Sequence, residues 1–303
     1  DVCTPTPLHA DQICQLAKWG AKNIITDKPI VTCAAELRRI MGATNSGKDV
    51  NVFLTFNHRY AAPVFMLREL VARNPTSVLR IDSGFLQQWL KKDPKCPQGD
   101  WRIEHPLCGL LDIGTHAADL ASFVAGREIK VVFNGKVESV GAFAQEKKFS
   151  DCGSADFRFH DYDFVGSGRY HQSLAGHSDD IYVMVTMTSG TRYLWRMEWG
   201  SDTLFMSAPE HDFVNLNSRD GWEAHLRGDS PIFKGSAAND QFCETPPGHI
   251  PGWPMYWIRM FQAIAGHILR ERGDKCAEQF PPVMRLPVPM LQDAGLHITK
   301  YVE

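Results

Sequence analysis

The sequence predicts two unequal parts: the end of an α/β domain with a doubly wound parallel sheet, and a larger α+β domain with a mostly antiparallel open sheet. In the first 58 residues helix and strand patterns alternate, which is typical of parallel strands joined by helices. From residue 59 onward one helix is followed by many apolar strands and only two further helices, which indicates an antiparallel sheet. We therefore expect the domains to cover residues 1–58 and 59–303.

Four elements are expected in the first part. Apolar residues at helical spacing predict helices, and short apolar runs predict buried strands. Thr32 is expected to cap the second helix and Gly42 to end it. The predicted order is a helix over 8–19, a strand over 23–26, a helix over 32–41 and a strand over 50–56.

The larger part is predicted to hold three helices, over 62–73, 109–124 and 253–269. Segments rich in Val, Ile, Phe and Trp predict its strands. Ser189 and Gly190 predict a hairpin turn between two of them. Residues 91–109 are expected to form a long loop of the kind that often carries function. The predicted strands cover 78–84, 129–140, 181–187, 191–198, 203–207 and 213–216.

Composition and charge exclude several classes of protein. Hydrophobic residues make up 44% and charged residues 22%, which is typical of a folded chain with a core. The net charge of −3 argues against a nucleic-acid partner, and no apolar run reaches the ~18 residues of a membrane span. The eight cysteines include no C-x-x-C pair, so reduced thiols in a cytoplasmic enzyme are expected.

Two glycine motifs do not match the phosphate-binding sites that they resemble. Segment 42–48 approaches a P-loop, but Asp49 stands where a Ser or Thr would hold magnesium, and the order helix, loop, strand is reversed. Segment 166–171 lacks the third glycine of a dinucleotide fingerprint and opens no predicted helix. We expect a flexible turn there.

Asp112, His116 and Asp119 recur at positions i, i+4 and i+7, which predicts that they share one helix face. Polar side chains among apolar neighbours are costly unless they are paired or used. One interpretation is structural: either a solvated helix face or a buried histidine satisfied by Asp119. The other is a proton relay, because a histidine with its free pKa of about 6.5 exchanges protons at neutral pH. Spacing suggests no third ligand beside Asp112 and His116, so no metal is expected.

Lys28 lies at the end of the first predicted parallel strand, after Asp27. Ligands of open α/β sheets bind at the carboxyl ends of such strands. Lys28 is therefore a candidate for the site, and an ordinary surface lysine in a turn is the alternative.

Five motifs occur in a fixed order along the chain: Thr4-Pro5 with His9, Asp27-Lys28-Pro29, Asn57 to Tyr60, Trp101-Arg102, and Asp112 to Asp119. This series resembles the Gfo/Idh/MocA family of NAD(P)-dependent oxidoreductases, with its T-P-x-x-x-H, E-K-P and D-x-G-x-H-x-x-D motifs. Asp27 departs from the glutamate that is usual in the second motif.

The resemblance implies a Rossmann domain, a cofactor that is NAD or NADP, and a sugar or polyol substrate whose CH–OH group exchanges a hydride. It also implies a homo-oligomer, a dimer or a tetramer, with no nucleic-acid or membrane partner. Lys28, Asp112 and His116 resemble the catalytic group, and with Asp119 they are expected to contact substrate. The expected cofactor-binding residues are Thr4, Pro5, His9, Asp27, Lys28, Pro29, Asn57, Arg59, Trp101 and Arg102.

Members of this family begin with a G-x-G-x-x-G segment that is not found here. We expect that the chain is a fragment lacking at least two βα units and part of its last helix, and that alone it binds NAD(P) poorly. Two other functions stay open. One is a non-catalytic relative that binds a sugar or a protein partner, and the other is a metal-dependent hydrolase that uses Asp112 and His116.

Overall fold

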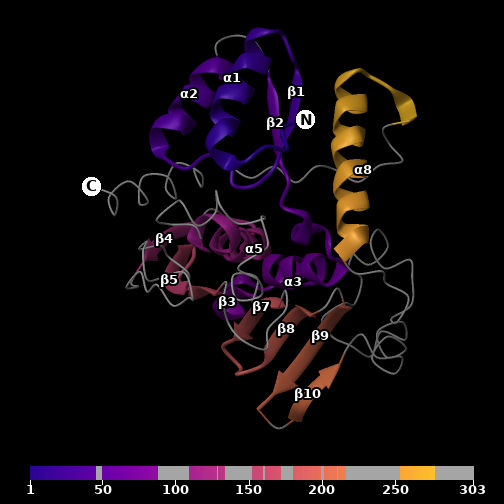
Figure 1. Ribbon diagram of the computed structural model, residues 1–303. Helices are drawn as coiled ribbons and strands as arrows, with labels where there is room; N and C mark the ends of the chain where they lie inside the picture. The colour runs from indigo at the N-terminus through magenta and orange to yellow at the C-terminus, as the bar shows by residue number, and fades with distance from the viewer. Residues whose placement is uncertain are drawn as a thin grey trace. The chain divides into compact units, whose positions relative to one another are not determined.

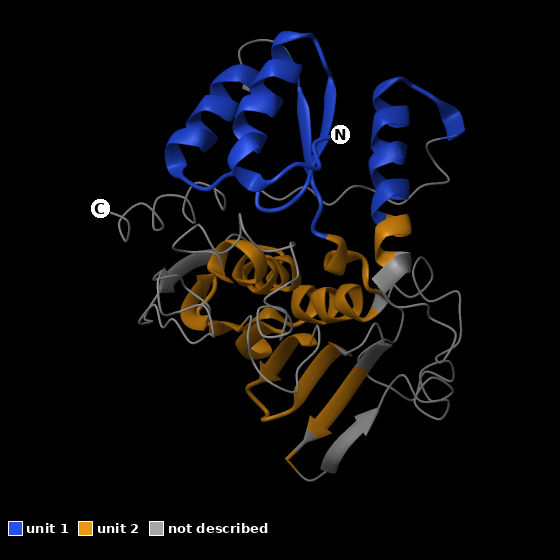
Figure 2. Ribbon diagram, in the orientation of Figure 1, with its two compact units in different colours: residues 1–56, 260–303 blue, residues 57–259 orange. Residues whose placement is uncertain are grey.

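The computed structural model divides the chain into two compact units (Figure 2). Unit 1 comprises Asp1–Phe56 and Met260–Glu303, and unit 2 comprises Asn57–Arg259. The expected boundary at residue 58 lies close to this division, whereas the segment from Met260, expected in the second part, groups with the first. The structure describes residues 1–45, 50–87, 109–127, 129–133, 152–159, 161–171, 180–198, 201–209, 211–215 and 253–276.

Unit 1 contains the predicted alternation of helices and strands (Figure 1). The strands β1 (Asn23–Thr26) and β2 (Asn51–Leu54) pair in parallel, with Asn23 opposite Asn51. The connection between them passes through α2, as a parallel pair requires. The expectation of a parallel α/β unit is confirmed. The elements in order are η1 (Thr6–Leu8), α1 (His9–Lys18), β1, α2 (Ala34–Asn45) and β2.

The core of unit 1 forms because each helix buries one apolar face. In α1 the buried residues Ala10, Ile13 and Ala17 follow helical spacing. They belong to one cluster with residues of β1, α2 and the turns between them. The remaining buried members are Val2, Ile24, Ile30, Val31, Leu37 and Ile40.

The second helix of unit 1 differs from its predicted bounds. It begins at Ala34 and continues through Gly42 to Asn45, so the expectation that Gly42 ends it was wrong. Gly42 has no positive φ, and a helical glycine costs only ~1 kcal/mol relative to alanine. Thr32 donates both its backbone N–H and its hydroxyl to Glu36 Oε2, at 2.7 and 2.9 Å, and so joins the preceding turn to the first turn of the helix.

Unit 2 is built on an eight-stranded sheet in the order β10-β9-β8-β7-β3-β6-β5-β4. Strands β3 and β6 pair in parallel, and the other neighbours pair antiparallel. The expectation of a mostly antiparallel open sheet is confirmed. The strands are β3 (Val78–Leu86), β4 (Ile129–Phe133), β5 (Cys152–Phe159), β6 (Val165–His171), β7 (Asp180–Met187), β8 (Arg192–Glu198), β9 (Ser201–Ala208) and β10 (His211–Asn215).

Helices α3 (Ala62–Arg73) and α5 (Thr115–Ala125) lie on one face of this sheet (Figure 1). Alternate residues of β3 face α5, and the Ser83 hydroxyl donates to the Ala117 carbonyl oxygen at 2.7 Å. Fully buried side chains such as Ile81, Leu120 and Trp195 fill the layer between helices and sheet. The other helical elements are η2 (Asn57–Tyr60), η3 (Pro75–Ser77), η5 (Leu110–Gly114) and α8 (Trp253–Glu271), which crosses the division between the units.

Two expectations about strands need correction. The predicted flexible turn at 166–171 was wrong, because these residues form most of β6. Its glycines are required by packing: a Cβ at Gly166 would lie 1.9 Å from the Ile81 carbonyl oxygen, and one at Gly168 would lie 2.3 Å from the Phe157 ring. Strand β5 was not predicted, although Ser154 to Phe159 alternate between polar and apolar residues and the apolar ones are buried. The expected hairpin turn is confirmed, with Gly190 at φ 85°.

The helix expected over 109–124 also differs in form. It opens as a π-helix, η5, and becomes α-helical only at Thr115. Parts of other expectations, namely strand residues 134–140 and loop residues 91–108, lie outside the described residues. Among the described helices, none combines the length and the apolar character that a membrane span requires.

Candidate functional site

His116 lies in the first turn of α5, inside a cluster of aromatic rings. Its ring centroid is 4.9 Å from that of His58 and 5.4 Å from that of Phe85, both in edge-to-face arrangements. His58 in turn lies 6.0 Å from the ring of Tyr256 on α8. His58 and His116 are 4% and 5% exposed, so elements η2, β3, α5 and α8 of unit 2 together enclose two imidazoles.

Asp112 lies on the π-helix η5, one turn before His116, and is also buried. The Thr115 hydroxyl donates to the Leu111 carbonyl oxygen at 3.0 Å across the junction between the π and α segments. Single π turns are rare and occur frequently at functional sites. The structure thus brings Asp112 and His116 to successive turns of one buried segment.

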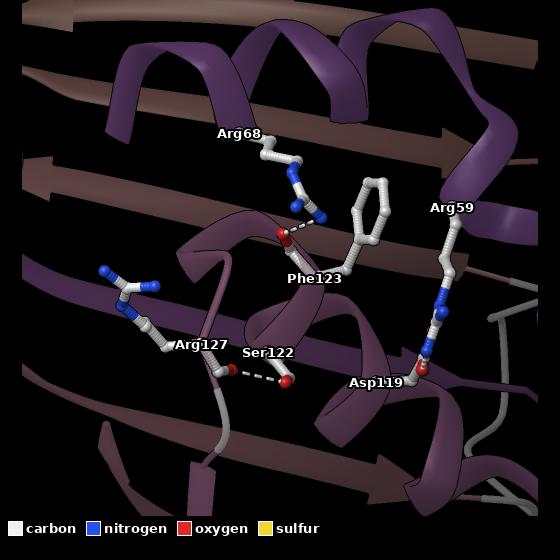
Figure 3. Close-up of polar contacts among 6 residues, drawn as sticks. All are labelled: Arg59, Arg68, Asp119, Ser122, Phe123 and Arg127. Carbon is white, nitrogen blue, oxygen red and sulfur yellow. Dashed lines mark hydrogen bonds and ion pairs between the residues drawn. The ribbon is translucent and has the colours of Figure 1, made fainter. Parts of the chain in front are cut away.

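Asp119 has a different neighbour, the guanidinium of Arg59 (Figure 3). Arg59 Nε donates to Asp119 Oδ2 at 2.7 Å, and Arg59 Nη2 donates to Asp119 Oδ1. Both side chains are buried. Burial raises the pKa of the Asp119 carboxyl, and the charge and hydrogen bonds of Arg59 oppose that rise. Arg59, expected on the cofactor side, and Asp119, expected on the substrate side, are therefore partners of each other.

A second arginine contacts the same helix near its C-terminal end (Figure 3). Arg68 Nη1 donates to the Phe123 carbonyl oxygen at 3.2 Å, and Arg68 Cζ lies 4.6 Å from the centroid of the Phe123 ring. Burial lowers the pKa of the Arg68 guanidinium. The Ser122 hydroxyl donates to the Arg127 carbonyl oxygen at 2.6 Å and closes the helix end. Side chains from α3 and η2 thus hold the helix that carries His116.

Lys28 belongs to unit 1 and follows the carboxyl end of β1. Its backbone N–H donates to Asp27 Oδ1 at 2.8 Å, and the Thr55 hydroxyl donates to the same oxygen at 2.8 Å. The Lys28–Pro29 peptide bond is cis. The Asp27 carboxylate therefore orders the backbone of the turn that presents Lys28, whose side chain is half-buried.

His9 joins two of the segments expected on the cofactor side. Its Nδ1 lies 3.0 Å from the Pro29 carbonyl oxygen and its Nε2 lies 2.7 Å from the Thr4 carbonyl oxygen. The Thr4 hydroxyl donates to Gln12 Oε1 at 2.8 Å, whereas Pro5 is exposed. His9 is 1% exposed, so it acts as a buried link between the Thr4 segment and the Lys28 turn.

Two buried carboxamides stand out in the described part of unit 2. Asn57 Nδ2 and Gln87 Nε2 have no hydrogen-bond partner there, although their residues are 2% and 1% exposed. A buried donor without a partner costs about 1–3 kcal/mol, so each is available to a ligand. Asn57 was expected on the cofactor side. Gln87 was not predicted; it directly follows β3, and its backbone N–H donates to the His171 carbonyl oxygen at 2.8 Å.

The remaining expected residues, Trp101 and Arg102, lie outside the described part of the chain. Within that part, no group of three or more His, Cys, Asp or Glu side chains is arranged to hold a metal ion.

Comparisons with known proteins extend this description. The chain is 29% identical over 136 residues, 44% of its length, to a myo-inositol 2-dehydrogenase from Thermotoga maritima, and the match covers 37% of that protein. The chain thus spans less than half the length of the curated relatives it matches. No family model matches the sequence.

Solved structures share the fold at low sequence identity. An oxidoreductase from Sinorhizobium meliloti aligns with a TM-score of 0.73 and 21% identity, over 98% of this chain and 73% of that one. A levoglucosan dehydrogenase in complex with NADH and levoglucosan aligns with a TM-score of 0.66 and 20% identity, over 100% and 78%. These similarities support the resemblance to the Gfo/Idh/MocA oxidoreductases. These solved structures share the fold of the chain described above, a parallel α/β unit and a mostly antiparallel open-sheet unit.

Proposed function

We propose that this chain is the substrate-binding and proton-transferring part of an NAD(P)-dependent dehydrogenase that acts on the CH–OH group of a sugar or polyol. The observation that carries the proposal is the buried pair Asp112 and His116 at the junction of a π turn and an α-helix. The matched inositol dehydrogenase and the levoglucosan dehydrogenase with its bound NADH support the class of substrate and of cofactor.

Oxidation of an alcohol to a ketone removes a hydride from carbon and a proton from oxygen. A bound nicotinamide would supply the acceptor for the hydride. A ring nitrogen of His116 takes the hydroxyl proton, and the Asp112 carboxylate orients the ring or a substrate hydroxyl. The aromatic rings around His116 keep bulk water away from that transfer.

Lys28 has the chemistry that the developing alkoxide requires, because an ammonium group stabilises negative charge on oxygen. We therefore propose Lys28 as the third member of the catalytic group with Asp112 and His116. The residues that would hold the cofactor fit this role: the turn after β1 is ordered by Asp27 and His9, and Asn57 offers a buried donor.

Gln87 extends the proposal to the rest of the substrate. Sugars and polyols present several hydroxyl oxygens, and the Gln87 carboxamide has a buried N–H that can donate to one of them. We propose Gln87 as a residue that binds a substrate hydroxyl.

The test measures absorbance at 340 nm with the full-length natural protein, NAD or NADP, and a panel of sugars and polyols. We expect turnover of at least one polyol, and a decrease in kcat of about 10²–10⁴-fold for His116→Gln because general acid–base catalysis contributes that much. Lys28→Met should lower kcat comparably, whereas Lys18→Met, at an exposed position on α1, should not. No turnover with either cofactor, or hydrolytic activity that a chelator abolishes, would overturn the proposal.

The expected homo-oligomer also stays a prediction. Sedimentation velocity with the full-length protein tests it, with a dimer or a tetramer as the expected result and a monomer as the contrary one.

A further inference from the structure

His58 contacts the proposed base, although its own role is not assigned by the reaction. It lies in η2, next in sequence to Asn57 and Arg59, and its ring is buried against His116, Phe85 and Tyr256. The centroids of the two imidazoles are 4.9 Å apart and their planes make an angle of 77°. The edge of one ring therefore points toward the face of the other.

This geometry distinguishes between the charge states of the pair. A protonated imidazole carries positive charge at its edge, and the face of a neutral aromatic ring is negative, so a pair with one proton is attractive. A pair with two protons places like charges within 5 Å in a buried setting. At an effective dielectric constant of ~20 that repulsion weakens binding of the second proton by ~100-fold or more.

Other ionisable groups surround the pair in the described part of unit 2. Asp112 precedes His116 on η5, and Asp119 follows it on α5 but is paired with Arg59 from η2. Tyr256 on α8 faces His58, and the Tyr170 ring on β6 packs against Gly114. Arg259 donates to the Tyr60 carbonyl oxygen at 3.3 Å. The facing residues of β3, Ile81, Ser83 and Phe85, carry no charge. The His116 segment thus carries two acidic residues, Asp112 and Asp119, and a carboxylate one turn from His116 favours positive charge on an imidazole.

We propose that His58 is a positioning residue for His116 and that the two imidazoles together hold a single proton. This inference rests on the proposed function for its catalytic meaning, since His116 is the proposed base. The neutral His58 ring holds the His116 ring in place and stabilises the cation that His116 becomes when it takes the hydroxyl proton.

The direct test is a pH titration of the histidine ring nitrogens, followed by ¹H–¹⁵N NMR on ¹⁵N-histidine-labelled full-length protein. The wild-type protein is compared with the variants His58→Phe and His116→Phe. Phe keeps a planar ring in each position. In the wild-type protein we expect both rings to respond to one shared proton between pH 8 and 5, with the second bound at least ~100-fold more weakly. In each variant the remaining ring should titrate alone. His267→Phe, on the part of α8 in unit 1, should leave the shared transition unchanged.

The proposal would be overturned if the two histidines of the wild-type protein each bound a full proton independently, with the same pKa as in the single variants. It would also be overturned if the wild-type pair took up no proton between pH 8 and 5. His58→Gln provides a second variant if the Phe variant fails to fold, and circular dichroism establishes which variants fold. This titration needs no substrate or cofactor. A shared transition in a protein without dehydrogenase activity would therefore contradict the proposed function but support the shared proton of the two imidazoles.

Activity then separates positioning from a merely structural role. We expect His58→Phe to lower kcat by about 10-fold or more with a smaller change in KM, because uniform substrate binding is retained. Between the wild-type protein and His58→Phe, the acid limb of the plot of kcat against pH should shift by the same amount as the NMR titration of His116. An unchanged pH profile with reduced thermal stability would show that His58 only packs, and would overturn the positioning role.

Discussion

Arg59 and Asp119 form a two-point ion pair in which the side chains are only 7% and 2% exposed. The pair joins η2 to α5 at positions directly beside His58 and three residues after His116. Two contacts therefore connect the same two elements, one between charged groups and one between imidazole rings. Both contacts hold the helix that carries the proposed base.

Breaking this ion pair should destabilise the protein strongly. Asp119→Asn leaves a buried guanidinium without its counter-charge, so we expect the free energy of unfolding to fall by about 3–5 kcal/mol. Urea denaturation followed by circular dichroism measures it. Arg73→Ala, which removes an exposed pair with Glu69 on α3, is the matched control and should cost less than about 1 kcal/mol.

The double variant Arg59→Met with Asp119→Leu should recover much of the lost stability, because no charge then stays buried alone. If Asp119→Asn instead folds with wild-type stability and raises only the KM for a polyol, Asp119 contacts substrate and the ion pair is not its main role.

The turn that presents Lys28 should depend on the shared acceptor Asp27. Thr55→Val removes a buried hydroxyl that donates to Asp27 Oδ1, and we expect a loss of about 1 kcal/mol of stability. We also expect kcat to fall by up to about 100-fold, since small misplacements of a reacting group have effects of that size. Thr44→Val, another buried hydroxyl in unit 1, should lose similar stability with no change in kcat. Equal kcat values in the two variants would contradict the prediction that Asp27 positions Lys28 for the reaction.

Gln87 should matter for substrate binding and not for folding. Gln87→Leu removes a buried donor that has no hydrogen-bond partner among the described residues, so we expect the free energy of unfolding to stay constant or to rise slightly. The KM for a polyol should rise by about 10-fold or more because one hydroxyl loses its donor. Gln15→Leu on α1 serves as the control in the same kinetic assay. A pronounced loss of stability with unchanged KM would show that Gln87 has a structural role instead.

Two glycine substitutions should have opposite effects. Gly166→Ala places a Cβ on the Ile81 carbonyl oxygen of the neighbouring strand, and we expect a loss of about 2–4 kcal/mol or failure to fold. Gly42→Ala meets nothing within 4 Å at a helical position, and we expect a gain of about 0.5–1 kcal/mol. Thermal unfolding of both variants checks the sign. A destabilised Gly42→Ala variant would contradict the helix through residue 45.

Patterns within one element were enough to predict most of the elements. The helix over 62–73 and the strand over 23–26 were predicted at their observed bounds, because their apolar spacing and flanking residues are local signals. The parallel arrangement of β1 and β2 was also predicted, although β2 is shorter than the predicted strand over 50–56. The candidates Asp112 and His116 came from their spacing on one segment, whereas their burial depends on contacts with other elements of unit 2.

Features that depend on contacts between distant segments were not predicted. Gly166 and Gly168 suggested a turn by themselves, and only the approach of Ile81 and Phe157 makes them strand residues. The carboxamide of Gln87 has no sequence signal, because its missing partner is a property of its surroundings.

The alternation of elements and the residue types that can transfer a proton could be read from local patterns, since both follow from side chains close together along the chain. Tertiary structure alone decided which groups become partners: Arg59 with Asp119, and His58 with His116. The physical reason is that burial and charge pairing arise between residues about 60 positions apart, where spacing along the chain carries no information about distance.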